Sequence, residues 1–163
     1  MGVTTYDVET RRHYDTDRAR IYDRQITGFT WMRLATWLEA RIVARLLTAF
    51  KLDETDLAID MPCGTGLLGP VFAGQRCRAM PCDISPDMMR YARINYQGAN
   101  LFAMVQGDLA QIPFPDGNFD AVVSIGLMHR VPPEIRGRSR RRFWSMMPAL
   151  YDGRIRLIRK SIW

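Results

Sequence analysis

From residue 57 onward, short apolar runs alternate with stretches of helical character, and this alternation limits the possible folds more than any other feature of the chain. Apolar runs separated by helices favour parallel strands that are buried on both faces of a sheet. The sequence predicts strands over residues 57–61, 78–83, 101–106 and 119–125, and helices over 67–73 and 86–96. Right-handed crossovers place the carboxyl ends of such strands at one edge of the sheet, where ligands bind. We therefore expect an α/β protein with three layers and a mostly parallel sheet.

An amphipathic helix is predicted before this alternation, over residues 31–50. Its apolar side chains recur four residues apart, at Leu34, Leu38, Ile42, Leu46 and Phe50. This period is typical of a helix that buries one face. Trp31, at the start of the helix, is expected to pack in the core. With the polar and aromatic segment before it, the helix makes up the first of three expected regions, a helical lead-in and lid over residues 1–50.

Composition places the chain among water-soluble globular proteins, since 47% of its 163 residues are hydrophobic and 25% are charged. Charged residues occupy the N-terminus where a signal peptide needs an apolar run, and no apolar stretch approaches the roughly 18 residues of a membrane span. We therefore expect a cytoplasmic protein without a membrane span. The three cysteines form no CxxC pair, which argues against a disulfide framework and against a metal site.

The net charge of +6 is concentrated at the C-terminal end of the chain. From residue 136 onward there are nine basic residues and one acid, whereas the rest of the chain carries a net charge of −2. A surface for a polyanion would have to lie in this tail alone, and a run such as the arginines of residues 138–142 is typically solvated. We accordingly expect no nucleic-acid partner.

A glycine-rich loop follows the first expected strand and provides the first candidate site. Its candidate ligand-binding residues are Asp60, Pro62, Cys63, Gly64 and Gly66. Glycine lets the backbone approach a ligand closely, and the following helix directs its N–H groups towards that ligand. With Gly69, the glycines also match G-x-G-x-x-G, the dinucleotide fingerprint. The carboxylate of Asp60 would repel a pyrophosphate, however, and it favours a ligand that carries positive charge.

Two more acids follow the next two strands. Asp83 ends the second strand, where a carboxylate accepts hydrogen bonds from both hydroxyls of a ribose. Ile84 and Met88 come directly after it and are placed to pack against an adenine ring. Asp108 ends the third strand, beside the second, within reach of an adenine amino group. The three strand ends together indicate a ligand that contains adenosine.

These motifs resemble those of class I S-adenosylmethionine-dependent methyltransferases. The matching segments are DMPCGTG, CDISPDMM, QGDLAQIPFPDGNFDAVVSI and MHRVPPE, and they occur in the expected order between residue 57 and about residue 135. The chain looks most similar to the small-molecule branch that includes ubiquinone and menaquinone methyltransferases. The resemblance implies a Rossmann-like fold, S-adenosylmethionine as cofactor, methyl transfer to a small-molecule acceptor, and a cofactor-binding core over residues 51–135.

The resemblance also implies a role for each candidate residue. Asp60, Gly64 and Gly66 would contact the methionine portion of the cofactor, with Pro62 and Cys63 in the same loop, Asp83 would bind the ribose, Asp108 and Leu109 the adenine, and Ile125 the far wall. Cys63 is interpreted as a small loop residue rather than a nucleophile, because the motif pairs it with no base. His129 is a weak candidate for a general base, and no catalytic residue is otherwise assigned.

The tail over residues 136–163 departs from the resemblance. Enzymes of this kind continue with a helix, a fifth strand and a reversed pair of strands, whereas 28 residues fit at best one strand, over residues 153–162. We expect the tail to be divergent or truncated and to add little to the sheet. The sheet edge left exposed would favour self-association.

Two other functions stay open at this point. The chain could bind the cofactor without turnover, as a truncated fragment or a pseudoenzyme. The G-x-G-x-x-G pattern also leaves an NAD-dependent oxidoreductase as a less favoured alternative.

Overall fold

The computed structural model describes residues 30–126, 131–147 and, as backbone, 156–160. Its helices and strands, in chain order, are α3 (Thr30–Ala49), β1 (Leu57–Asp60), α4 (Gly69–Ala73), β2 (Arg78–Asp83), α5 (Pro86–Asn95), β3 (Val105–Gln106), β4 (Ala121–Ile125), α6 (Pro133–Ser145) and β5 (Arg156–Lys160). Within these ranges, no helix combines the length and the apolar character needed to cross a membrane.

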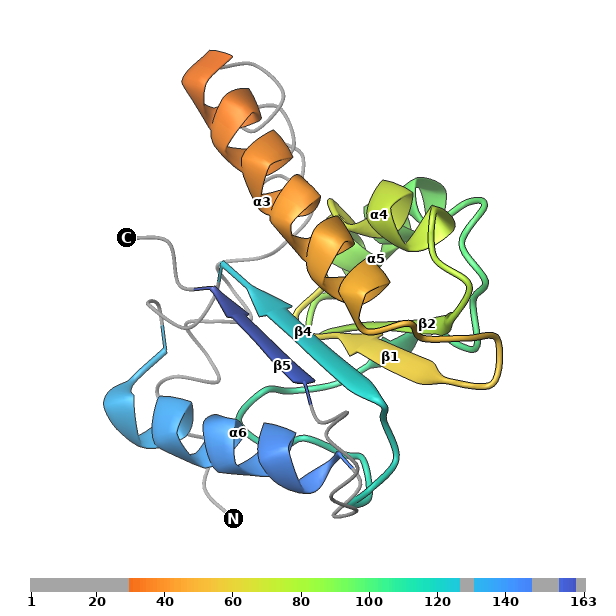
Figure 1. Cartoon of the computed structure of the whole chain (residues 1–163). Helices are drawn as coiled ribbons and strands as arrows, with labels where there is room; N and C mark the ends of the chain where they lie inside the picture. The colour runs from red at the N-terminus through yellow and green to blue at the C-terminus, as the bar shows by residue number, and fades with distance from the viewer. Residues whose placement is uncertain (1–29, 127–130, 148–155, 161–163) are drawn as a thin grey trace.

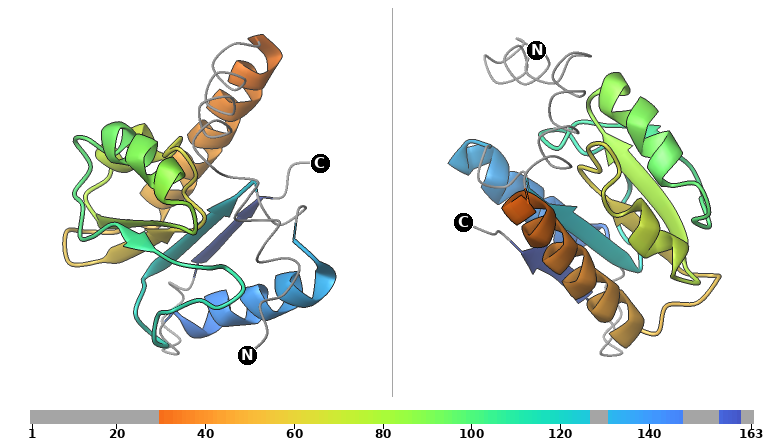
Figure 2. Two further views of the ribbon diagram at one scale, coloured as in Figure 1. Left: turned by 180° about the vertical axis from the view of Figure 1, so that it is seen from behind. Right: turned by 90° about the horizontal axis from the view of Figure 1, so that it is seen from above.

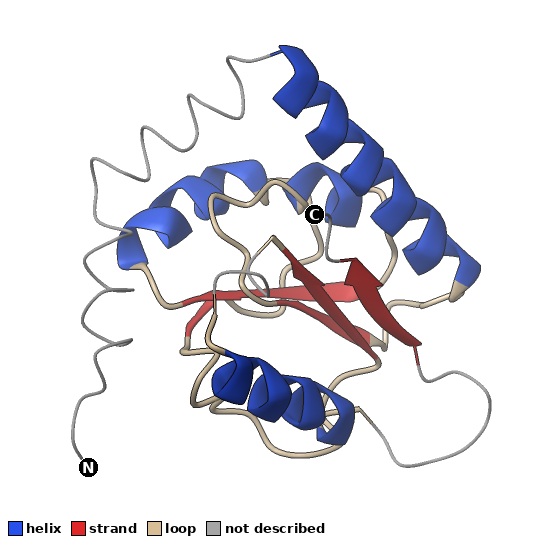
Figure 3. Ribbon diagram, turned by 90° about the vertical axis from the view of Figure 1, so that its left-hand side faces the viewer, coloured by secondary structure: helices blue, strands red, loops and turns tan. Residues whose placement is uncertain are grey.

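The five described strands form one sheet in the order β3-β2-β1-β4-β5, and every pair of neighbours is parallel (Figure 1). The chain leaves β1 for one side of the sheet and returns past β1 to β4, so β1 lies at the centre. Helices α3, α4 and α5 cover one face and α6 covers the other, as the side view in Figure 3 shows. The expectation of a three-layer α/β fold with a parallel sheet is therefore confirmed.

Each central strand supplies side chains to two separate cores because successive residues point to opposite faces. On β1, Ala58 faces the core beneath α3, α4 and α5, whereas Leu57 and Ile59 face the core beneath α6. On β4, Val123 belongs to the first core and Val122 to the second. Strands buried on both faces are mainly apolar, which explains why 57–61 and 119–125 have apolar residues at most positions, although Asp60 ends β1.

Helix α3 has the expected extent but buries a different face from the one the spacing indicated. Val43 and Leu47 are 1% exposed and pack in the core, whereas Leu34, Leu38 and Leu46 are exposed. Trp31 is 70% exposed, so its expected place in the core is wrong. The reason is visible in Figure 1, where the N-terminal half of α3 extends beyond the sheet and only its last turns cover it. The lead-in before α3 lies outside the described residues.

Helix α6 begins before the expected tail boundary, so residues 135 and 136 lie in the same helix. The helix lies on the face of the sheet opposite α3, α4 and α5 (Figure 2). It packs Phe143 against the sheet, and Met146, which follows the helix, lies in the same core. The Ser139 hydroxyl donates to the carbonyl of Leu109 at 2.9 Å. Beyond the helix, β5 pairs with β4 over five residues. The expectation that residues from 136 onward add little to the sheet is therefore wrong, because β5 extends the sheet beside β4 and α6 covers one of its faces.

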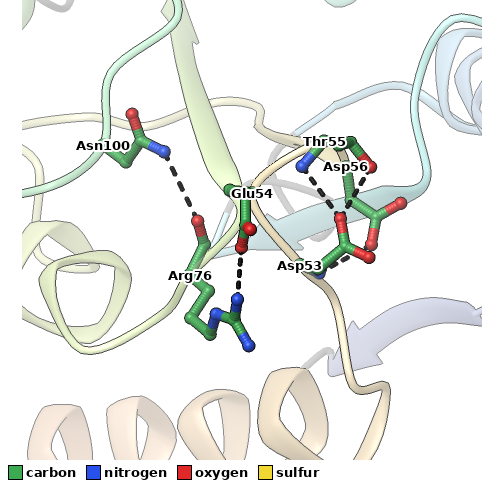
Figure 4. Close-up of polar contacts among 6 residues, drawn as sticks. All are labelled: Asp53, Glu54, Thr55, Asp56, Arg76 and Asn100. Atoms are coloured by element: carbon green, nitrogen blue, oxygen red, sulfur yellow. Dashed lines mark hydrogen bonds and ion pairs between the residues drawn. The ribbon is translucent and has the colours of Figure 1, made fainter.

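Figure 4 shows the amino edge of the sheet, where the chain enters β1. The Asp53 carboxylate accepts hydrogen bonds from the Thr55 N–H at 2.8 Å and the Thr55 hydroxyl at 2.6 Å, which closes the turn before the strand. Glu54 forms an ion pair with Arg76, which precedes β2. Both partners are exposed, so this pair stabilises the fold little. The contacts at this edge are structural, which leaves the carboxyl edge as the place for a ligand.

The close approach of α4 to α5 leads to a prediction for Gly69. A β-carbon added at Gly69 would lie 2.1 Å from the carbonyl oxygen of Asn95. Backbone atoms cannot yield easily, so Gly69→Ala should lower the free energy of unfolding by about 2 kcal/mol or more. Gly74→Ala is the matched control, since its nearest atom would be 3.5 Å away. Urea unfolding should show a marked loss for the first variant and little change for the second; equal losses would contradict the proposed packing constraint.

Candidate functional site

The loop that leaves β1 is shaped by two glycines in conformations that other residues rarely adopt. Gly64 has φ +54° and Gly66 has φ +86°. A β-carbon at Gly64 would meet no atom within 4 Å, so the space above this residue is open. At Gly66 the added carbon would lie 2.8 Å from the Cα of Ala92, in α5. Gly64 therefore leaves room on the outer side of the loop, while Gly66 allows the loop to lie against the helix.

Asp83 connects this loop to the end of β2. Its Oδ2 accepts the N–H of Gly64 at 2.8 Å, and its Oδ1 accepts the N–H of Ser85 at 2.9 Å. The Cys63 N–H donates to the Cys82 carbonyl at 2.9 Å, which adds a second link between the loop and β2. Only 6% of Asp83 is exposed. The residue expected to bind a ribose thus also fixes the loop, which sequence analysis did not anticipate.

Asp60 lies at the end of β1 beneath the loop and is 2% exposed. Its Oδ2 accepts a hydrogen bond of 2.6 Å from the hydroxyl of Tyr96, which caps the C-terminal end of α5. Tyr96 is fully buried. The structure therefore places Asp60 at the end of β1, next to the C-terminal end of α5 and with almost no exposed surface.

Burial dominates the electrostatics of both acids. It raises the pKa of Asp60 to about 7, against the lowering effect of the Tyr96 hydrogen bond, and the nearby charge of Asp83 raises it further. Burial also raises the pKa of Asp83, although backbone hydrogen bonds from Ser85, Gly64 and Ile84 oppose the change. Two buried carboxyl groups so close together favour a ligand that brings positive charge, because each is costly to ionise alone.

The cysteines around the site are protonated thiols. Burial, with the nearby carboxyl groups of Asp60 and Asp83, raises the pKa of Cys63 far above its usual value. The same causes raise the pKa of Cys82 to about 12. A thiolate nucleophile is therefore disfavoured at both positions, and Cys63 packs in the core beneath the loop as a small residue.

The candidate adenine-binding residues lie in different environments. Asp108 is half-buried, and its Oδ1 accepts the Ala110 N–H at 2.8 Å, close to the point where the Gly107 N–H donates to the Asp83 carbonyl. Ile84 is half-buried after β2, whereas Met88 is 2% exposed and offers little surface to a ligand. The Leu109 side chain packs in the core beneath α6, so it offers little surface to a ligand.

The structure brings Asp60, the glycine loop, Asp83 and Asp108 together at the carboxyl edge of the sheet. Ile125 ends β4 at the same edge and packs against the core beneath α3. The weak catalytic candidate His129 lies outside the described residues. Sequence analysis missed Tyr96 and Asn95, whose side-chain amide donates to the Thr65 carbonyl at 2.8 Å. No local pattern marks either residue, because both contacts join segments about 30 positions apart.

Comparison with known proteins identifies the family. The methyltransferase domain family matches residues 59–144, more than half of the chain and all of this site. The chain therefore belongs to the methyltransferase domain family, as the motifs predicted.

Individual relatives agree with this assignment. An uncharacterized chloroplastic methyltransferase of Arabidopsis thaliana is 33% identical over 51% of the chain and 26% of its own length. Demethylmenaquinone methyltransferase of Thermobifida fusca is 36% identical over 44% of the chain and 32% of its own length. The chain thus spans about a third or less of these two relatives.

Among solved structures, magnesium protoporphyrin IX methyltransferase from Synechocystis with bound S-adenosylmethionine has a similar fold, with a TM-score of 0.72. The match covers 90% of this chain and 74% of that one, at 19% identity. The chain therefore has the fold of S-adenosylmethionine-dependent methyltransferases.

The residues of the carboxyl edge suit this cofactor. Gly64 leaves open space that a side chain would fill, and the adjacent carboxyl groups match the ammonium and sulfonium charges of S-adenosylmethionine. The hydroxyl of Thr65 is buried and has no hydrogen-bond partner in the described part of the chain, and the same is true of Ser124 near the end of β4. Buried polar atoms without partners are rare and often find them in a bound ligand or water.

The pKa of Asp60 leads to a prediction about stability. Because the pKa of Asp60 is about 7 in the folded state, above its usual value of 3.8, the folded chain retains a proton that the unfolded chain releases between these pH values. Stability contributed by the protonated form is present below about pH 4 and is lost as pH rises towards 7. Asp60→Asn keeps an acceptor for Tyr96 and carries no charge. Its stability relative to wild type should therefore increase by roughly 1 kcal/mol per pH unit through this window and then level off.

Urea unfolding at intervals from pH 4.5 to 8.5 measures this difference. Glu54→Gln, which removes an exposed carboxyl group from the opposite edge, is the matched control and should show no such rise. A difference between Asp60→Asn and wild type that does not vary with pH would contradict the assigned pKa.

Proposed function

We propose that this chain binds S-adenosylmethionine at the carboxyl edge of its sheet and transfers the methyl group to a small-molecule acceptor. The observation that carries the proposal is the pair of buried carboxyl groups, Asp60 and Asp83, around a loop whose outer side is open at Gly64. Acids in this position suit a cationic ligand and oppose a pyrophosphate. This favours S-adenosylmethionine over NAD, in agreement with the family.

The proposed binding mode assigns each part of the cofactor to a strand end. The loop from Asp60 to Gly66, with Pro62 and Cys63, would hold the methionine portion. Asp83 keeps lone pairs on both oxygens beyond its two backbone bonds, and these would accept the ribose hydroxyls. Asp108, the Leu109 backbone and Ile84 would surround the adenine, and Ile125 would form the far wall.

When bound, S-adenosylmethionine supplies a methyl group already activated by the sulfonium, so the protein contributes mainly orientation and exclusion of water. Methylation of an acceptor hydroxyl also releases its proton, which would pass to water, since no base is assigned among the described residues. A small acceptor is supported by the demethylmenaquinone methyltransferase among the relatives. We therefore propose a hydroquinone or phenol as the class of acceptor to test first.

The experiment for this function measures binding and turnover separately. Calorimetric titration should show S-adenosylhomocysteine binding in the micromolar range and no measurable binding of NAD. Incubation with S-adenosylmethionine and a panel of hydroquinones and phenols should then release S-adenosylhomocysteine in an acceptor-dependent manner.

Each outcome of that experiment distinguishes the proposed function from one alternative function. Tighter binding of NAD would overturn the cofactor assignment. Binding of S-adenosylhomocysteine without turnover on any acceptor would instead support the second candidate, a cofactor-binding domain without activity.

Asp83→Ala tests the ribose assignment. Loss of hydrogen bonds to a charged acceptor should weaken S-adenosylhomocysteine binding by about 1.5 to 3 kcal/mol. Because Asp83 also binds the Gly64 and Ser85 N–H groups, the variant should additionally lose about 1 to 2 kcal/mol of folding stability. Glu54→Ala, an equal change of charge at the amino edge, should leave the affinity unaltered. A folded Asp83→Ala chain with wild-type affinity would show that Asp83 does not hold the cofactor.

A further inference from the structure

The glycine loop is held from below by the last turn of α5, which no assignment above includes among the cofactor-binding residues. Gly66 lies against Ala92, and Gly69 lies against the carbonyl of Asn95. The Asn95 side chain donates to the Thr65 carbonyl at 2.8 Å, in the same loop. Tyr96 completes the turn and donates its hydroxyl to Asp60 at 2.6 Å. These four contacts join the C-terminal end of α5 to one side of the glycine loop.

We propose that Tyr96 is a positioning residue for the cofactor site, which fixes the Asp60 carboxylate beneath the glycine loop in the orientation that receives the cationic methionine end of the cofactor. The inference rests on the proposed function, since it assumes that this end binds at the loop. Tyr96 itself touches neither the open side of the loop nor the proposed place of the cofactor, because it is fully buried behind Asp60.

The groups around Asp60 explain why the Tyr96 hydroxyl has so strong an influence on the Asp60 carboxylate. The titratable groups that interact electrostatically with Asp60 are Tyr96 from α5, Cys63 from the loop, and Cys82 and Asp83 from β2. All of these are neutral or acidic, so none supplies a positive charge. The Tyr96 hydroxyl is the side-chain donor that stabilises the ionised form of Asp60, and the remaining counter-charge has to come from the ligand.

This arrangement couples ligand affinity to the ionisation of Asp60. If the carboxylate attracts the ammonium and sulfonium of the cofactor, affinity increases as Asp60 loses its proton with rising pH. The Tyr96 hydrogen bond lowers the pKa of Asp60, so its removal makes ionisation harder. The pH at which binding reaches half of its full strength should then move upwards by about one unit, the size of one hydrogen bond to a charged group.

Tyr96→Phe isolates the hydroxyl, because the ring that packs against Phe72 is retained. Calorimetric titration with S-adenosylhomocysteine between pH 5.5 and 8.5 should show a midpoint about one pH unit higher than in wild type. At pH 7 the affinity should be about 5- to 10-fold weaker, with a smaller difference at pH 8.5. Tyr91→Phe is the matched control, since it makes the same atomic change on the same helix and Tyr91 has no contact with Asp60; its profile should match wild type.

The outcomes distinguish this inference from the proposed function. If wild type fails to bind S-adenosylhomocysteine at every pH, the proposed function fails. If wild type binds and Tyr96→Phe has the same midpoint and affinity, the function stands and the positioning role is overturned. A uniform loss of affinity without a shift of the midpoint would also overturn it, because that result indicates a merely structural role for the hydroxyl.

A second measurement on the wild-type chain covers the case in which Tyr96→Phe does not fold. With 13C-labelled tyrosine rings, the Tyr96 resonance should follow the ionisation of Asp60 between about pH 6 and 8 in the free protein. Saturating S-adenosylhomocysteine should move this transition to lower pH, because the ligand keeps Asp60 ionised. A Tyr96 resonance that responds to pH identically with and without ligand would contradict the proposal.

Discussion

The segment that runs from β1 into α4 lies so close to α5 that no β-carbon fits at Gly66 or Gly69. The position of the glycine loop at the carboxyl edge of the sheet depends on this contact. Alanine at Gly69 would overlap the Asn95 carbonyl, and alanine at Gly66 would come within 2.8 Å of the Ala92 backbone. Once the loop is held there, its N–H at Gly64 reaches Asp83 and its inner side covers Asp60. The three glycines of the fingerprint thus have different roles: the first leaves space for a ligand, and the other two allow close packing.

That packing has an electrostatic consequence, because it removes two carboxyl groups from water. Asp83 recovers part of its lost hydration from two backbone N–H groups, whereas Asp60 has the Tyr96 hydroxyl. The pKa of both acids is nevertheless raised. The amino edge differs in this respect, since its acids are exposed or half-buried and bind local turn groups, the Leu57 N–H or an exposed arginine. Among the described residues, the buried acids are Asp60 and Asp83, and both lie at the edge where a cationic ligand is proposed.

The sequence was sufficient to predict those parts of the fold that depend on local periodicity. Strand β2 has the predicted bounds, and the order of motifs placed Asp60, Asp83 and Asp108 at one edge. Strand β3 is shorter than expected, since Leu101 forms only an isolated bridge with Ala79 before the paired residues Val105–Gln106. The face of α3 was mispredicted because the extent of the sheet beneath a helix is a tertiary property. In α6 and directly after it, the apolar residues Ile135, Phe143 and Met146 lie on the buried side, but the arginines between them are typical of a solvated run and hide this pattern in the sequence.

The contact between Tyr96 and Asp60 shows why site residues are harder to predict than strand ends. A strand-end acid is marked by its place in a local pattern, whereas Tyr96 is simply an aromatic residue at the end of a helix until the fold brings it to a residue 36 positions earlier. In the proposed role Tyr96 influences the ligand only through the Asp60 side chain, so Tyr96 is not part of a ligand-binding motif. Yet a buried carboxyl group without a basic neighbour is sensitive to each hydrogen bond it accepts, because few other groups stabilise its charge. A ligand that binds this charge stabilises the folded state and favours the ionised form of Asp60, so loop packing, ionisation and binding are thermodynamically linked.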